Sequence, residues 1–143
     1  MSVITAIRSY LTGVSDLTDL VETRIYPDAN TSGTVTFPYI VFGQDSSNHE
    51  HHQGGAAGLT EGRWEFNIFA DTPLSAEAAG TELREALDGF QRADMGDDDL
   101  DVRSVHLQTE DTVYIPGQQD KKDGAFNKRM DFMIWHAETV PTF

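Results

Sequence analysis

The sequence contains no cysteine and few basic residues, and each shortage removes classes of function. Without cysteine, disulfide frameworks, thiolate zinc sites, iron–sulfur clusters and cysteine nucleophiles are all excluded. No apolar run approaches the roughly 18 residues that a membrane-spanning helix needs. The N-terminal apolar stretch carries Arg8 and lacks a small-residue cleavage site, so we do not expect a signal peptide.

The scarcity of basic residues leaves the chain strongly acidic. Its 143 residues include 10 Lys and Arg against 24 Asp and Glu, a formal net charge of -14. Such a surface repels phosphate backbones and anionic lipid headgroups, so we expect neither tight nucleic-acid binding nor a membrane partner. The length predicts a single domain over residues 1–143.

Hydrophobic spacing predicts an α+β fold. Helical spacing covers residues 2–12, and Thr72 caps a second helix that has Pro73 at its first position and ends near Gly89. Between these two helices, Ser15 or Asp16 is predicted to cap a short turn that follows the first helix. The predicted architecture is two helices packed on one face of a mostly antiparallel four- to five-stranded sheet, in the order helix, strands, helix, strands. The predicted strands are residues 38–43, 61–70, 102–109, 112–116 and 125–137, with a bulge between Val102 and Val105.

Three polar segments are predicted to lie between these elements. Residues 44–60 are glycine-containing and predict a long flexible loop. Residues 117–124 predict the tip of a hairpin. Residues 94–101 include five aspartates and predict an exposed turn.

The second face of the predicted sheet carries more apolar side chains than two helices can cover. Alternation places Phe69, Met133 and Trp135 on the face opposite the helices. One interpretation is that loops or the C-terminal residues 140–143 fold over this face. The other is a subunit interface, in which Trp, Phe and Met are enriched.

Polar clusters were considered as metal and catalytic sites. The run His49, Glu50, His51 and His52 offers ligands for zinc or nickel but lacks the spacing of a zinc motif, which favours an exposed loop. The aspartates near residue 98 lack the ligand spacing of a calcium loop, which favours a solvated turn. No nucleophile elbow, phosphate-binding glycine loop or zinc-protease motif is present. We therefore predict no catalytic residue, no metal and no cofactor.

Basic residues concentrate in the last predicted hairpin. Lys121 and Lys122 lie at its tip, and Lys128 and Arg129 follow in the last strand. The simpler interpretation is a surface patch of salt bridges. The alternative is a contact between these residues and an acidic neighbouring subunit.

In order and spacing, four segments of the chain resemble the tail completion or tail terminator proteins of long-tailed phages and related tail-like particles. An amphipathic N-terminal helix precedes the motif Val-Glu-Thr-Arg-Ile-Tyr-Pro at residues 21–27. Phe-Pro-Tyr-Ile-Val-Phe follows at residues 37–42, and Arg-Trp-Glu-Phe-Asn-Ile-Phe-Ala at residues 63–70 runs into the second helix. The terminal strand is Lys-Arg-Met-Asp-Phe-Met-Ile-Trp at residues 128–135. The resemblance covers most of the chain.

The resemblance implies a non-enzymatic structural protein of the virion, located at the neck end of the tail and assembled in the host cytoplasm. It implies a ring, usually of six copies, that caps the head-proximal end of the tail tube and ends tube polymerisation. Its partners would be further copies of itself, the tail tube protein and the head–tail connector, and genomic DNA would pass through the ring without specific binding. The expected subunit interface is Phe69, Met133, Trp135, Lys121 and Lys122, and the expected channel-facing acids are Glu61, Glu65, Asp97, Asp98 and Asp99.

Two alternatives to the tail terminator remain. The first is a neck or head-completion protein that binds the portal side of the particle. The second is a metal-binding module that uses His49, His51 and His52.

Overall fold

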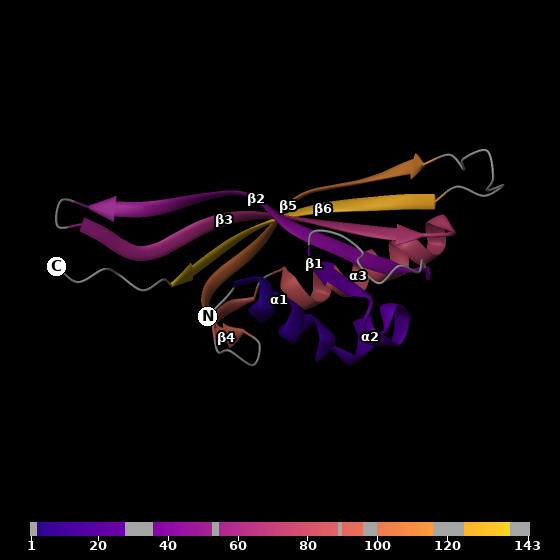
Figure 1. Ribbon diagram of the computed structural model, residues 1–143, viewed down its shortest axis with the longest axis horizontal. Coiled ribbons are helices and arrows are strands. Elements are labelled where there is room, and N and C mark those ends of the chain that lie inside the picture. The colour runs from indigo at the N-terminus through magenta and orange to yellow at the C-terminus, as the bar shows by residue number, and fades with distance from the viewer. Residues whose placement is uncertain are drawn as a thin grey trace.

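The computed structural model describes residues 3–27, 36–52, 55–88, 90–95, 100–115 and 125–137. Figure 1 shows a long twisted sheet with its helices gathered on one side. The elements follow in the order α1 (Val3–Thr12), α2 (Ser15–Val21), β1 (Ile25–Pro27), β2 (Tyr39–His52), β3 (Gly55–Ala70), α3 (Pro73–Leu87), β4 (Gln91–Met95), β5 (Leu100–Ile115) and β6 (Ala125–Ala137).

The sheet has the spatial order β1-β2-β3-β6-β5-β4. Every neighbouring pair from β2 to β4 is antiparallel, and the three-residue strand β1 adds to β2 in parallel. This confirms the α+β class and the mostly antiparallel sheet. Two counts differ from the prediction. The described residues form a sheet of six strands rather than four or five, and the expected short turn at residues 15–21 is a third helix, α2.

One hydrophobic core lies between the helices and one face of the sheet. Alternate residues of β3 enter it, as the sequence predicted, because successive side chains of a strand point to opposite faces. Trp64, Phe66 and Ile68 are at most 1% exposed. The core also contains Ile7, Leu11, Leu17 and Val21 from α1 and α2, Leu83 and Leu87 from α3, Ile40 and Phe42 from β2, and Met130, Phe132 and Ile134 from β6.

Two arginines attach the first two helices to the beginning of the sheet. The Arg8 guanidinium donates from Nε to the Ile25 carbonyl at 3.0 Å, and Arg24 Nε donates to the Pro38 carbonyl at 3.0 Å. The Arg8 bond satisfies a carbonyl oxygen of the edge strand β1, beyond which no further strand is paired in the described part of the chain, and the Arg24 bond satisfies the carbonyl just before β2. They give Arg24, within the motif at residues 21–27, a structural role.

Helix α3 begins as its sequence predicts. The Thr72 hydroxyl accepts a hydrogen bond from the Ser75 backbone N–H at 3.1 Å, and Pro73 occupies the first turn. Near the other end, the Tyr10 hydroxyl of α1 donates to the Ala86 carbonyl at 2.6 Å. Burial raises the pKa of Tyr10, so this donor stays protonated across the physiological range. The bond therefore fixes α1 against the last turn of α3.

The prediction of a flexible loop over residues 44–60 is wrong. β2 continues to His52 and β3 begins at Gly55, so residues 44–52 and 55–60 pair as the far part of a long antiparallel hairpin. Figure 1 shows this hairpin extending well past the helices. The pairing passes two irregularities, between Gln44 and Ser46 and between His49 and His51. Backbone pairing between the two strands defines this arm.

The prediction of an exposed turn over residues 94–101 is wrong at both ends, because residues 94–95 belong to β4 and residues 100–101 to β5. Asp94 pairs with Asp101 across β4 and β5, so only residues 96–99 between these strands lie outside the described residues. β5 is one strand rather than the two predicted. The predicted bulge is confirmed, because the register shifts between Val102 and Ser104.

Candidate assembly surfaces

The face of the sheet away from the helices, here called the outer face, carries the residues predicted as a subunit interface. Phe69 follows the core residue Ile68, and Met133 and Trp135 alternate with Phe132 and Ile134. All three predicted residues are partly exposed. Their placement on one face is as expected from the alternation.

An aromatic cluster occupies the β1–β2–β3 end of the outer face. The Tyr39 ring stacks on Phe69 with centroids 5.0 Å apart and on Phe37 at 5.8 Å. Tyr26 meets Tyr39 edge-on at 6.2 Å. Burial, with a smaller contribution from Tyr26, raises the pKa of the Tyr39 hydroxyl. Phe69 is therefore partly covered by aromatic rings of its own chain.

A charged band crosses the middle of the outer face. The Arg129 Nε lies 3.9 Å from both a Glu65 and an Asp111 carboxylate oxygen. The Asp131 Oδ2 accepts from the Thr109 hydroxyl at 2.9 Å and lies 3.9 Å from the Arg63 guanidinium. The band places acids and bases side by side. The charge of Glu65, a predicted channel-facing acid, is therefore partly compensated by Arg129.

The charged band divides the predicted interface into two parts. Met133 and Trp135 lie beyond the band from Phe69, and in register they face Arg63 and Glu61 of β3. At about 3.4 Å per residue along the strand, Phe69 and Arg63 are roughly 20 Å apart. Sequence alternation identified the face correctly but not this division, because it does not give the register between strands.

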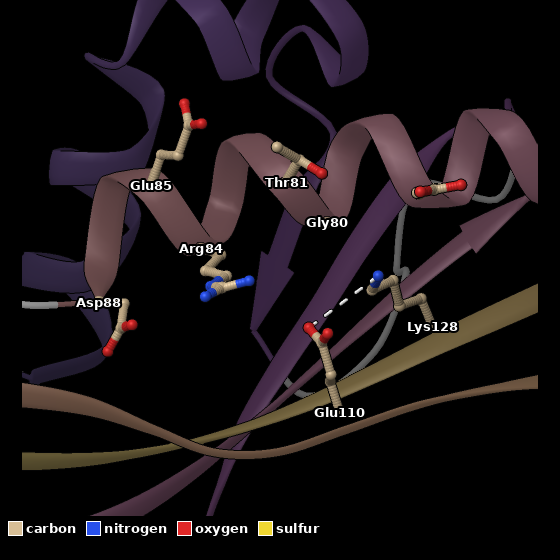
Figure 2. Close-up of a pocket in the computed structure, with 8 residues that line it drawn as sticks. Gly80, Thr81, Arg84, Glu85, Asp88, Glu110 and Lys128 are labelled. Carbon is tan, nitrogen blue, oxygen red and sulfur yellow. Dashed lines mark ion pairs between the residues drawn. The ribbon is translucent and has the colours of Figure 1, made fainter.

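A polar groove of about 560 Å³ separates α3 from β5 and β6 on the helix side. Figure 2 shows the Lys128 side chain crossing below Gly80, with its Nζ 4.0 Å from a Glu110 carboxylate oxygen. A Cβ at Gly80 would lie 2.6 Å from Lys128 Cδ, so glycine permits this crossing. Lys128 and Arg129 are thus engaged within the chain, as the salt-bridge interpretation of the basic patch expects.

A second groove, of about 610 Å³, lies between α2 and α3 and is acidic. Its lining includes no Lys or Arg, and its apolar lining residues are Leu20, Leu74 and Ala78. Leu74 is 77% exposed. The acids at its rim are Asp16, Asp19, Glu77 and Glu82.

Substitution of Glu82 tests the charge repulsion at this rim. Partial desolvation, followed by the like charges of Glu85 and Asp16, raises the pKa of the Glu82 carboxyl. A raised carboxyl pKa means that the ionised form destabilises the fold at neutral pH and ceases to do so as the pH falls through that pKa. We expect Glu82→Gln to raise the melting temperature slightly at pH 7, and the difference to vanish near pH 4. Thermal unfolding monitored by circular dichroism measures this.

Glu77→Gln on the same helix controls for the loss of one charge from an acidic protein. Near pH 4 Glu82 is protonated and neutral, so it should behave like Gln. If Glu82→Gln raised the melting temperature equally at pH 7 and near pH 4, the explanation by charge repulsion would be contradicted.

Besides the terminal strands β1 and β4, parts of their neighbours β2 and β5 have open edges within the described part of the chain. β1 pairs only with Ile40–Phe42 of β2, which leaves residues 44–52 without a second neighbour. β4 pairs with β5 only up to Ser104, and the next two outward N–H groups donate to Phe90 O and Asp88 Oδ1. From Thr109 to Ile115 the structure describes no strand on that side. We call these stretches the β2 open edge (residues 44–52) and the β5 open edge (residues 109–115).

The remaining predicted residues lie outside the described part of the chain. These are Lys121, Lys122, Asp97, Asp98 and Asp99, together with the side chains of His49, His51 and His52. Among the side chains that are described, no group of three or more His, Asp or Glu residues converges as metal ligands would. No helix in the described ranges has the length and apolar character to cross a membrane.

The described chain is an α+β fold with its helices on one face of the sheet and a partly exposed apolar face on the other. Comparison with known families gives the specific assignment. Residues 5–136 match the family described as tail completion protein gp17, and the chain belongs to that family.

A solved structure supports the same fold. A chain from the virion of a native gene transfer agent particle superposes with a TM-score of 0.68 at 18% sequence identity. The match covers 97% of this chain and 94% of that chain. No curated protein matches the sequence significantly. Family membership supports a structural role in a phage tail.

Proposed function

We propose that copies of this protein form a ring, of six subunits, that caps the head-proximal end of a phage tail tube. The ring ends tube polymerisation and joins the tail to the head–neck connector. Family membership supports the location in the tail. The observation that carries the assembly role is the partly exposed apolar surface of the outer face, which the described residues of the chain leave uncovered.

In this proposal the two apolar parts of the outer face become contacts between neighbouring copies. Trp135 and Met133 form one part, and Phe69 with the aromatic cluster forms the other. Aromatic residues and Met are enriched in protein interfaces because they bury a large area at modest cost in side-chain entropy. Lys121 and Lys122 remain proposed contacts with the acidic surface of a neighbouring copy.

The acidic balance of the chain suits a channel through which DNA slides. Carboxylates facing the lumen repel phosphate and prevent the DNA from binding to the wall. Glu61, Asp97, Asp98 and Asp99 stay the proposed lumen residues. Glu65 contributes less to this repulsion, because Asn67 donates to it at 3.0 Å and Arg129 lies close by.

The experiment that tests this proposal is electron microscopy of particles produced with and without the chain. With the chain, we expect a ring at the junction of tail and neck. Without it, we expect tubes of uncontrolled length that are not joined to heads. Tails of normal length on heads that fail to join them would instead support a head-completion role on the portal side, and intact particles without the chain would overturn both.

A further inference from the structure

We propose that the β5 open edge of one copy pairs with the β2 open edge of the next, so that the sheets of neighbouring subunits join into one. This inference rests on the proposed ring and identifies the main-chain contact that closes it. Its partner is a second copy of this chain. The evidence is the topology of the sheet, the exposure of β5 and the charge on its edge.

The last part of the β5 open edge lacks the usual protection against pairing, although Glu110 and Asp111 lie earlier on the same edge. Residues 108–114 are all exposed, and Val113 and Tyr114 are 51% and 53% exposed. Native proteins usually protect such an edge with charges, proline, a bulge or an additional strand. The end of this edge, Thr112 to Ile115, has no charge and no proline, and consists of β-branched and aromatic residues that favour strands.

Strand directions favour β2 as the partner. β2, β3, β6 and β5 are successively antiparallel, so β5 runs opposite to β2. A second copy in the same orientation therefore brings its β2 alongside β5 in the antiparallel sense, which preserves the alternation of the sheet. Antiparallel pairing is also slightly more stable per residue than parallel pairing.

The two open edges lie at opposite lateral edges of the same sheet, one toward the β1 end of the strand order and the other toward the β4 end. A contact between them is head-to-tail, with different surfaces on the two copies, and such contacts repeat until the rotation closes them into a ring. β1 covers the beginning of β2, and β4 covers the beginning of β5. The free stretches are therefore staggered along the strands, which predicts strands tilted to the ring axis, as in closed barrels.

The alternative pairing, β5 with β5 in a two-fold dimer, is opposed by charge. Glu110 and Asp111 lie on the open edge, and an antiparallel copy of the same strand would bring the same acids near them. Like charges opposite each other across strands are destabilising.

Disulfide crosslinking tests the pairing, because the chain has no cysteine of its own. Cysteines are introduced at Ser46, Ser47 or Asn48 on β2 and combined with Thr112→Cys or Val113→Cys on β5. Within one molecule β3 and β6 lie between these strands, so the sites are separated by at least about 14 Å at about 4.8 Å per strand. A disulfide needs Cα atoms within roughly 7 Å, so any bond formed joins two copies.

The crosslinking is performed both on assembled particles and on the purified full chain. We expect at least one combination to give a ladder of crosslinked multimers that ends at the closed ring, while the single-cysteine variants give none. Val113→Lys should abolish the ladder without altering the melting temperature, because the side chain is exposed. Leu74→Lys, at an exposed apolar residue on α3, is the matched control and should leave the ladder intact.

Crosslinking through Val113→Cys alone would show β5–β5 pairing and overturn the inference. Rings at the tail neck without any β2–β5 crosslink would also overturn it, while leaving the proposed function standing. Conversely, the purified chain could give a β2–β5 ladder while electron microscopy finds no copy of the protein in the tail. That result would uphold the edge pairing and overturn the proposed function.

Discussion

Replacing Phe66 by alanine will lower the free energy of unfolding by about 3–5 kcal/mol. Phe66 is fully buried at the centre of the sheet. Its ring stacks on Phe42 with centroids 5.4 Å apart and meets Phe132 edge-on, also at 5.4 Å. Removing the aromatic ring leaves a cavity between β2, β3 and β6. Backbone hydrogen bonds hold these three strands in place, so neighbouring side chains fill the cavity only in part. Urea denaturation should show a lower midpoint with an unchanged slope.

The matched control is Phe69→Ala on the same strand. Phe69 has the same side chain, but it lies on the outer face and is only partly buried, with Tyr39 as a stacking partner. We expect a loss of about 1 kcal/mol, mostly from this stacking. If Phe69→Ala were as destabilising as Phe66→Ala, the outer face would be covered within the single chain and the assembly surface would not exist.

The central strands could be predicted from the sequence because their hydrophobic residues alternate. In residues 63–70 every second residue enters the core, and the same period identified Met133 and Trp135 as outer-face residues. The beginning of helix α3 was predictable, since Thr72 and Pro73 are local signals that act without tertiary contacts, and its end at Leu87 lies two residues before the predicted Gly89. These elements determine which face of the sheet is buried.

The β2–β3 arm could not be predicted in the same way. Residues 44–52 contain no apolar residue, so their sequence has no alternation to reveal a strand. Their pairing with β3 comes from backbone hydrogen bonds, which every residue except proline can make. Helix α2 was underestimated for a related reason, because a helix this short depends on packing Leu17 and Val21 into the core rather than on its own propensity.

The candidate surfaces were likewise predictable only in part. Alternation predicts which residues share a face, but the charged band depends on the register of three strands, which brings Glu65, Arg129 and Asp111 together. The open edges depend on how far β1 and β4 extend along their neighbours. Neither property is encoded in one segment, so both required the assembled sheet.

Replacing Trp135 by glutamate will leave the fold largely intact and prevent ring assembly. Trp135 is only partly buried on the outer face, so the single chain loses little core packing. In the ring, we expect each contact to lose about 2 kcal/mol or more, a weakening of roughly 30-fold, because central tryptophans dominate interface energies. Circular dichroism should give a native spectrum, while electron microscopy of particles carrying the variant should show no ring at the neck.

Two controls separate the interface from the fold. Glu61 lies directly opposite Trp135 in register, so the new carboxylate adds a like-charge contact within the sheet that costs up to about 1 kcal/mol. Trp135→Gln removes the indole without adding this repulsion, and we expect it also to impair assembly, whereas Leu74→Glu on the helix side should assemble normally. Normal rings formed by both Trp135 variants would show that this part of the outer face does not contact another copy, and the ring would then have to be held by the strand edges alone.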